Sequence, residues 1–347
     1  MSVPRYESAP AAAGERGRDF GAVHAAQVRR TVEAYRGLFH DPHNEPLDLR
    51  EWGGRAFERI ARSAPNLAEE IDGIATGAEL GVHEIAAINA RTELLALGAR
   101  AHRGECSAVV GLPAERAPVA VQTWDWSEAL ADNWLLWTIR HPDGRVVRTV
   151  TEYGIVGKIG ISTANVGVLF NILHHERDGE FLGVPVHVLA RSLLDEADDL
   201  NTAMLGSVAA EVSASTALTL VVRGSALSIE LCPEGPGVVL PDERGLLVHT
   251  NHFLAEHGRP GCREIRVGPD TYVRMDVLRR ALRGSVEDLS AEAVRTAMTS
   301  HVGGGAAVCC HADPASQPHA TLATIALHLD TAELEVHPGG PCAAARR

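Results

Sequence analysis

The stretch Gly104-Glu105-Cys106-Ser107-Ala108-Val109-Val110 separates two kinds of sequence in this chain of 347 residues. From about residue 21 to residue 102, apolar residues recur at three- and four-residue steps, which is typical of amphipathic helices. After residue 104 come short β-rich runs separated by turn residues such as Pro142-Asp143-Gly144. We therefore expect a helical N-terminal segment, followed by an antiparallel sheet whose first strand begins at Cys106.

Runs of strands alternate with runs of helices in the remainder of the chain, without a strict βαβ repeat. This order favours an α+β layered fold. Predicted strands cover 106–112, 119–126, 135–141, 146–152, 155–162, 167–171, 217–222, 228–232, 245–250, 306–309, 321–329 and 333–337, and predicted helices cover 186–194, 198–208, 274–282 and 291–299. No linker is long enough to separate two domains, so we expect one domain over 19–347, preceded by a flexible polar tail over 1–18 that lacks the apolar segment of a signal peptide.

Charge and composition exclude several classes of function. The chain has 32 basic and 45 acidic residues, a formal charge of -13, which disfavours nucleic acid as a partner. No run approaches the 18 apolar residues, roughly, that a membrane-spanning helix needs, so no membrane partner is predicted. The six cysteines form no C-x-x-C pair, a pattern typical of free thiols in a reducing compartment. We expect a soluble, cytoplasmic protein.

Cys106 stands at the start of the first predicted strand, where a thiol is suited to one particular reaction. If the peptide bond before Cys106 is cut, the residue gains an α-amine beside its own sulfur. Such an amine has a pKa of about 7.7–8.0, close to working pH, and it would act as a base without a separate histidine. The alternative is that Cys106 is a buried structural cysteine that behaves as a small apolar residue.

Two further segments carry residues suited to a site. Four of the five tryptophans lie between Trp124 and Trp137, and Asp125 stands between Trp124 and Trp126, either in a desolvated pocket or in an exposed turn. The string Thr151-Glu152-Tyr153-Gly154-Ile155-Val156-Gly157-Lys158-Ile159-Gly160 contains the only lysine of the chain. It lacks the strand-then-helix setting of a phosphate loop, so that interpretation is weak.

Histidines raise the question of a metal. His249-Thr250-Asn251-His252 follows an apolar strand, and an asparagine amide at a strand end can donate to a developing oxyanion. His174-His175-Glu176, the His249 and His252 pair, and His311 are the metal candidates, but none has a recognised spacing with a third ligand. The sequence therefore predicts no metal site.

Taken together, these segments resemble the acyl-coenzyme A:6-aminopenicillanic acid acyltransferase (isopenicillin N acyltransferase) family of N-terminal nucleophile hydrolases. The resemblance covers roughly residues 19–342. The strings that carry it, in chain order, are Gly104-Glu105-Cys106, Gln122-Thr123-Trp124-Asp125, Thr151-Glu152 through Gly160, and His249-Thr250-Asn251-His252.

The resemblance implies a four-layer αββα sandwich, made as a precursor that cuts itself between Glu105 and Cys106. The products would be an α chain 1–105 and a β chain 106–347 that stay associated. The Cys106 thiol would attack the carbonyl of Glu105, and the freed amine would then act as base while the same sulfur attacks the substrate. The resemblance also implies catalytic roles for Asn251 as oxyanion donor and for Asp125 as an orienting group. We further expect substrate-binding roles for Thr123, Trp124, Trp126, Glu152 and Lys158, with the alternative that the two tryptophans are core aromatics.

The chain departs from the family pattern at three places. Glu105 precedes the nucleophile where glycine is usual, which crowds the bond to be cut. Gln317-Pro318 stands where Ser-Arg is expected, and Cys309-Cys310 stands where Cys-Arg is expected. Two arginines that could pair with a substrate carboxylate are thus absent, which argues against penicillin precursors as substrates.

We therefore expect a self-processing cysteine amidohydrolase or N-acyltransferase acting on a small amide or acyl thioester of natural-product metabolism. It would need no cofactor, and acyl-coenzyme A would enter only as an acyl-donor substrate. The alternative is an unprocessed, catalytically silent relative that acts as a binding protein. The mass of the purified chain distinguishes the two, because only the first predicts two polypeptides.

Overall fold

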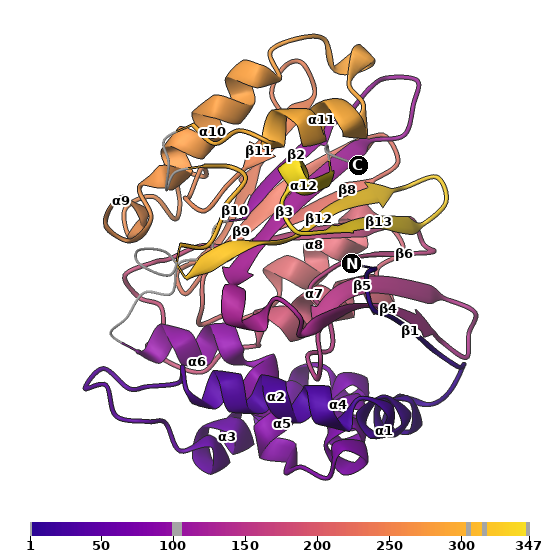
Figure 1. Ribbon diagram of the computed structural model, residues 1–347, viewed down its shortest axis with the longest axis vertical. Helices are drawn as coiled ribbons and strands as arrows, with labels where there is room; N and C mark the ends of the chain where they lie inside the picture. The colour runs from indigo at the N-terminus through magenta and orange to yellow at the C-terminus, as the bar shows by residue number, and fades with distance from the viewer. Residues whose placement is uncertain (1, 99–105, 303–306, 314–317, 345–347) are drawn as a thin grey trace.

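The computed structural model describes residues 2–98, 106–302, 307–313 and 318–344 (Figure 1). Within them the chain forms two β-sheets flanked by helices, which confirms the predicted α+β class. The helices are α1 (Ala13–Val23), α2 (Ala25–Arg36), α3 (Leu49–Ser63), α4 (Pro65–Ala78), α5 (Val82–Asn89), α6 (Arg91–Leu97), α7 (Val186–Glu196), α8 (Leu200–Val208), α9 (Glu264–Val267), α10 (Asp270–Ala281), α11 (Ala291–Met298) and α12 (Pro341–Ala344), with 3-10 turns at Glu128–Leu130 and Val286–Asp288.

The strands pair antiparallel except at one edge. An eight-stranded sheet has the order β1-β4-β5-β6-β7-β8-β9-β10, and a five-stranded sheet has the order β11-β2-β3-β12-β13. The strands are β1 (Arg5–Ser8), β2 (Ser107–Gly111), β3 (Val119–Ser127), β4 (Trp134–Arg140), β5 (Val146–Glu152), β6 (Ile159–Ser162), β7 (Gly167–Ile172), β8 (Thr216–Val222), β9 (Ser225–Cys232), β10 (Gly235–Val239), β11 (Leu246–His249), β12 (His319–His328) and β13 (Glu333–Pro338). Among the strands of the described residues, β1 alone runs parallel to its neighbour, β4.

Side-chain alternation along the strands establishes four layers. In β2, Ala108 and Val110 belong to the core between the two sheets, whereas Val109 packs on the other face with Leu278 of α10 and Val294 of α11. Behind the larger sheet, α7 packs so closely on β6 that a Cβ at Gly160 would lie 2.6 Å from Leu194 Cδ1. The layers are therefore α10 and α11, the five-stranded sheet, the eight-stranded sheet, and α7 with α8, as the αββα prediction required.

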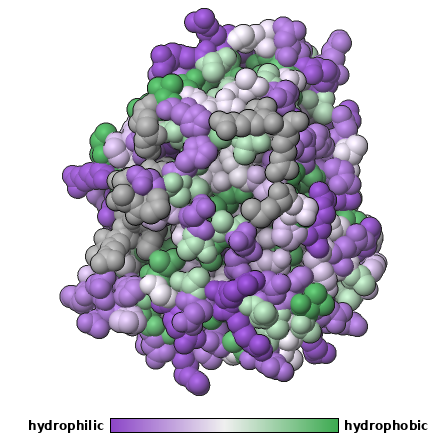
Figure 2. Space-filling view, in the orientation of Figure 1, coloured by the Kyte–Doolittle hydropathy of each residue, from purple (hydrophilic) through white to green (hydrophobic). Residues whose placement is uncertain are grey.

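Helices α1 to α6 gather at one end of this sandwich (Figure 1). Their apolar faces join the inter-sheet core, to which Phe20, Val28, Ile74 and Ile88 contribute fully buried side chains. The predicted helical N-terminal segment is thus confirmed for the described residues. On the face that Figure 2 shows, hydrophilic residues predominate and apolar ones form scattered patches. Among the described helices, none is both long and apolar enough to cross a membrane.

The structure differs from the predicted elements in three places. The segment 1–18 is not a loose tail, because Arg5–Ser8 pairs with β4, Ser8 accepts a hydrogen bond from Trp137 Nε1 at 2.7 Å, and α1 already begins at Ala13. Strand pairing through the backbone does not require a periodic pattern of side chains, so the sequence did not indicate this strand. Residues 307–309, the described part of a predicted strand, are not a strand, and β10 (Gly235–Val239) was not predicted.

Candidate active site

Cys106 directly precedes β2, in the interior of the five-stranded sheet. Its side chain is only 3% exposed. Its carbonyl oxygen accepts hydrogen bonds from Asn171 Nδ2 and from Arg274 Nη1, both at 3.0 Å. Two donors from β7 and α10 thus hold the backbone at this residue. Glu105, the predicted partner in self-cleavage, lies outside the described residues.

Several charges surround the Cys106 thiol. Burial, and after it the carboxylate of Asp125, raise the pKa of the thiol to about 11. A hydrogen bond from the Asp125 backbone and the positive charges of Lys158 and Arg274 act in the opposite direction, with smaller effect. The sulfur in the uncut chain is therefore an S–H group at neutral pH, and it needs a base before it can act as a nucleophile.

Strand β3 supplies four of the predicted site residues. Thr123 Oγ1 accepts a hydrogen bond from the backbone N–H of Ser107 at 3.2 Å, which ties β3 to the residue after Cys106. Asp125 is 1% exposed within β3, so it is a desolvated carboxylate and not a residue of an exposed turn. Trp124 and Trp126 are both 2% exposed. The register of β3 with β12 shifts between Thr321 and Ala323, opposite Asp125 and Trp124, so an irregularity lies beside the carboxylate.

Glu152 and Lys158 form a buried ion pair at the end of β5. Lys158 Nζ lies 2.6 Å from Glu152 Oε2 and 3.9 Å from the ring centroid of Trp124. The same carboxylate oxygen lies 3.4 Å from Arg91 Nε, and the other oxygen accepts a hydrogen bond from the Tyr35 hydroxyl. Two basic side chains, Arg91 and Lys158, thus share one carboxylate.

The charged groups around Glu152 and Lys158 determine the protonation of both side chains. Burial, and after it the charge of Arg91, lower the pKa of Lys158 to about 7, although Glu152 acts in the opposite direction. Burial also acts against ionisation of Glu152, but Arg91 and Lys158 outweigh it and lower the pKa of this carboxyl. Glu152 is therefore a carboxylate at neutral pH, while the Lys158 ammonium is close to its titration point.

Asn251 follows β11 and is held by three bonds. Its backbone N–H donates to Thr271 Oγ1 at 2.7 Å, its Nδ2 donates to the carbonyl of Ile172 at 2.8 Å, and its Oδ1 accepts from Arg274 Nη2 at 2.9 Å. A guanidinium only donates and a carbonyl only accepts, so these partners determine the orientation of the amide. One hydrogen of Nδ2 is engaged with Ile172.

Arg274 connects the pieces of the site. It is 1% exposed on α10, and its Nε donates to Asp270 Oδ2 at 2.9 Å. Its Nη1 reaches the Cys106 carbonyl and Ser107 Oγ, the latter at 3.1 Å, and its Nη2 reaches Asn251. Sequence reasoning missed this residue, along with Asn171 and Arg91. A buried arginine on a predicted helix has no local signal that separates it from a solvated one.

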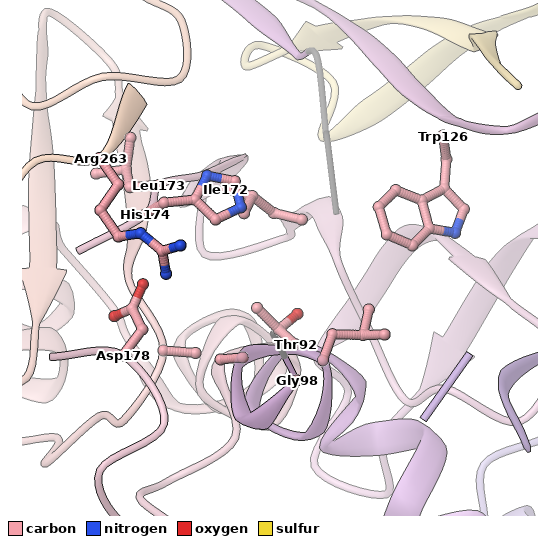
Figure 3. Close-up of a pocket in the computed structure, with 11 residues that line it drawn as sticks. Thr92, Gly98, Trp126, Ile172, Leu173, His174, Asp178 and Arg263 are labelled. Atoms are coloured by element: carbon pink, nitrogen blue, oxygen red, sulfur yellow. The ribbon is translucent and has the colours of Figure 1, made fainter. Parts of the chain in front are cut away.

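A pocket opens next to these residues (Figure 3). In Figure 3, His174, Asp178 and Arg263 lie on one side and Trp126 on the other, with Thr92 of α6 below them. The pocket is also lined by Leu95, Ala96, Gly98, Ile172, Leu173 and Ala214. The Ile172 carbonyl accepts a hydrogen bond from the Asn251 amide. A residue of the pocket wall is therefore bonded directly to the predicted oxyanion donor.

The polar side of the pocket contains one cation with no internal partner in the described chain. Asp178 is satisfied, because Oδ1 accepts from Ser215 Oγ at 2.6 Å and Oδ2 accepts from the backbone N–H of His175 at 2.7 Å. His174 is paired with Glu264. For the Arg263 guanidinium, the described residues provide no ion pair or hydrogen bond. This side of the pocket can therefore receive an anionic group.

Comparison with known proteins establishes the family. The chain is 30% identical over 272 residues to the acyl-coenzyme A:6-aminopenicillanic-acid-acyltransferase 40 kDa form of Emericella nidulans, and the alignment covers 78% of this chain and 75% of the relative. The chain belongs to this acyltransferase family. Membership places it among amidohydrolases and acyltransferases, as the sequence motifs predicted. No family model matched the chain.

The chain also aligns with solved structures, among them the following two. A mutant of conjugated bile acid hydrolase from Clostridium perfringens aligns with a TM-score of 0.45 at 8% identity, over 67% of this chain and 92% of the other. Penicillin V acylase from Agrobacterium tumefaciens aligns with a TM-score of 0.45 at 10% identity, over 67% of this chain and 83% of the other.

Proposed function

We propose that this member of the acyltransferase family is a self-processing cysteine amidohydrolase or acyltransferase whose nucleophile is the thiol of Cys106. The observation that carries the proposal is the convergence on this residue. Asn171 and Arg274 hold its carbonyl, while Asp125, Lys158 and Arg274 act electrostatically on its sulfur. A structural cysteine would need none of these charged neighbours.

Self-processing is the first proposed step. The Cys106 sulfur attacks the carbonyl carbon of Glu105, the C–N bond between the two residues breaks, and the nitrogen takes a proton to become the α-amine of Cys106. Water then hydrolyses the resulting thioester, which returns the thiol and leaves a carboxylate on Glu105. The positive charge of Lys158 favours the thiolate in this step, because it lowers the pKa of the thiol against the effect of burial.

Turnover uses the amine that processing releases. The amine takes the proton of the Cys106 thiol, and the sulfur attacks the carbonyl of the substrate. The second hydrogen of Asn251 Nδ2, which Ile172 does not use, donates to the oxygen that becomes negative. The amine of Cys106 then protonates the leaving group, and water or an acceptor amine attacks the thioester. Asp125 orients the α-amine.

The pocket of Figure 3 supports a substrate class. Trp126 and Ile172 offer an apolar surface near Asn251, and the Arg263 guanidinium offers a cation at the far side. We infer a small amide or acyl thioester whose apolar part packs on Trp126 and which bears a carboxylate or another anionic group near Arg263. Acyl-coenzyme A is one such acyl donor, and the reaction belongs to natural-product metabolism.

Intact mass spectrometry of the purified protein tests the nucleophile. We expect two polypeptides of 105 and 242 residues, which together account for the 347 of the chain. The variant Cys106→Ala should give one polypeptide of full length, whereas Cys262→Ala, which changes a thiol elsewhere, should be cut like the wild type. A full-length wild-type chain, or a Cys106→Ala chain that is cut, would contradict self-processing.

A second experiment separates hydrolysis from transfer and tests the substrate class. Paired N-acyl amides that carry either a carboxylate or a neutral carboxamide are incubated with the enzyme, with and without hydroxylamine as acceptor. Hydroxamate formation reports an acyl-enzyme that accepts amines. The carboxylate substrate should have the lower KM, and Arg263→Gln should remove this preference. Equal KM values for both substrates in the wild type would overturn the role of Arg263.

A further inference from the structure

Four side chains of the types that bind metals meet near the C-terminal helix α12. They lie close enough to the candidate active site that Asp125, after burial and Cys342, raises the pKa of one of them, Cys309. They are His301, which follows α11, Cys309 and His311, which precede β12, and Cys342 in α12. Their ligand atoms all lie within 4.8 Å of one another. Three chain segments therefore converge here with two imidazoles and two thiols.

The distances inside the cluster agree with those between ligands of one tetrahedral ion. Cys309 Sγ lies 3.6 Å and Cys342 Sγ 3.4 Å from His311 Nε2, and the Nε2 atoms of His301 and His311 lie 2.9 Å apart. Zn–S bonds of about 2.3 Å and Zn–N bonds of about 2.0–2.1 Å place S and N ligands about 3.6 Å apart and two N ligands about 3.3 Å apart. The Nε2 atoms of His301 and His311 are closer together than two N ligands of one ion, and a rotation of either side chain would bring them to the ligand spacing.

The chemical types of the four side chains indicate which metal ion they would bind. Sulfur and imidazole nitrogen suit zinc and do not suit Mg²⁺ or Ca²⁺, which prefer oxygen. Cys309 is buried, Cys342 is half-buried and both histidines are exposed, so an ion can enter from solvent and still have four protein ligands. We propose that His301, Cys309, His311 and Cys342 bind one Zn²⁺ ion in a closed, structural site.

The site departs from the sequence-based expectation of no metal. The spacing of the four residues spans 301 to 342 and contains no recognised motif, because α12 returns to α11 only after β12 and β13 have formed. The close approach is built into the backbone. A Cβ at Gly340 would lie 2.5 Å from Cys309 Sγ, so the glycine lets the start of α12 reach the buried thiol.

Zinc at this position would join the C-terminal helix to the strand that supports the candidate active site. Cys310, between the proposed ligands Cys309 and His311, donates its backbone N–H to Thr321 Oγ1 at 3.0 Å, and Thr321 pairs with Asp125 across the sheet. The ion would therefore hold the segment before β12 in place. Cys106 takes no part in the site, so the proposal stands or falls independently of the proposed catalytic function.

Cobalt provides the test, because Co²⁺ replaces Zn²⁺ and is coloured. The reduced full-length protein is freed of metal by a chelator and titrated with Co²⁺. We expect one equivalent to bind, with thiolate-to-cobalt charge transfer and the intense visible bands of a tetrahedral site. Zn²⁺ should then displace the cobalt, bleach these bands and raise the melting temperature.

Variants show whether the cluster is the site. Cys342→Ala and His301→Ala change half-buried and exposed residues, so both should fold, which circular dichroism checks. Each variant should weaken Co²⁺ binding at least about 100-fold. This is more than the loss typical of changing a residue that contacts a metal ligand but not the metal. Cys262→Ala, a half-buried thiol elsewhere, should bind like the wild type. The proposal would be overturned if the reduced wild type showed no charge transfer on adding Co²⁺, or if the spectrum of Cys342→Ala were unchanged. It would also be overturned if Cys309 and Cys342 were joined by a disulfide and the protein still bound no Co²⁺ after that disulfide was reduced.

Discussion

Arg274 and Asn251 are joined by a buried hydrogen bond of 2.9 Å between the guanidinium Nη2 and the amide Oδ1. The same guanidinium donates to the carbonyl of Cys106. One side chain of α10 therefore determines the position of the proposed nucleophile relative to the proposed oxyanion donor. Because these hydrogen bonds go to the backbone of Cys106 and to the Asn251 amide oxygen, we infer that Arg274 is a positioning residue.

Replacing Arg274 should therefore affect the chemical step more than binding. We expect Arg274→Gln to lower kcat by about 10²–10³, the cost of losing a well-placed oxyanion donor, with KM changed only slightly. Steady-state kinetics on an amide substrate measures both constants. Arg279→Gln, which changes an exposed arginine of the same helix, is the control. An equal rise in KM without loss of kcat would mean that Arg274 binds substrate instead.

The charge of Lys158 should influence the rate of self-cleavage. Lys158→Gln removes a positive charge that lowers the pKa of the Cys106 thiol, so the thiolate fraction at a given pH falls. We expect cleavage at pH 6, where a Lys158 side chain with a pKa of about 7 is charged, to slow on the order of tenfold, which corresponds to about one pKa unit. Mass spectrometry at intervals after cell-free synthesis measures this rate. Lys158→Arg keeps the charge and should lose less, and equal loss in both variants would rule out the electrostatic role.

Glu93 should make the fold less stable as pH rises through neutrality. It is 1% exposed on α6, Oε1 accepts the Val186 N–H at 2.9 Å, and burial raises the pKa of the carboxyl from 4.5 to about 7. The folded chain thus keeps a proton that the unfolded chain releases above pH 4.5. Stability is lost between pH 4.5 and about 7, by an amount on the order of 3 kcal/mol.

Glu93→Gln should remove this loss, because a glutamine oxygen can accept the same hydrogen bond without a charge. We expect similar melting temperatures for the two proteins at pH 5 and a higher one for the variant at pH 8. Glu69→Gln, a change at an exposed carboxylate of α4, should show no such divergence. Parallel melting curves for Glu93→Gln and wild type from pH 5 to 8 would show that Glu93 is ionised in the fold.

The contact between α1 and α4 should tolerate no added methyl group. A Cβ at Gly73 would lie 2.2 Å from the carbonyl oxygen of Gly14, a backbone atom that cannot move without shifting a helix. Gly73→Ala should therefore destabilise the protein by about 1–3 kcal/mol in denaturant unfolding. Gly54→Ala in α3, where nothing lies within 4 Å, should stabilise it by about 0.5–1 kcal/mol. The same sign for both would contradict close packing of the helices.

The local pattern of the sequence was sufficient for most of the helices and strands and for the motif residues. Apolar spacing marked the N-terminal helices and most strands, and the strings around Cys106, Asp125, Lys158 and Asn251 indicated the family. In the structure, Asp125 and Lys158 act electrostatically on the Cys106 thiol, and Arg274 links Asn251 to the Cys106 carbonyl. It corrects the tail, because β1 (Arg5–Ser8) is held by backbone pairing with β4 that leaves no pattern in its side chains.

Tertiary structure alone decided which distant groups meet. Arg274 lies far along the chain from the carbonyl of Cys106, and Arg91 is brought to the carboxylate of Glu152 only when α6 packs against β5. The cluster of His301 and Cys342 depends in the same way on α12 returning to α11. The physical reason is that periodicity reports which face of an element is buried, whereas the partner of a buried charge is decided by how separate elements pack.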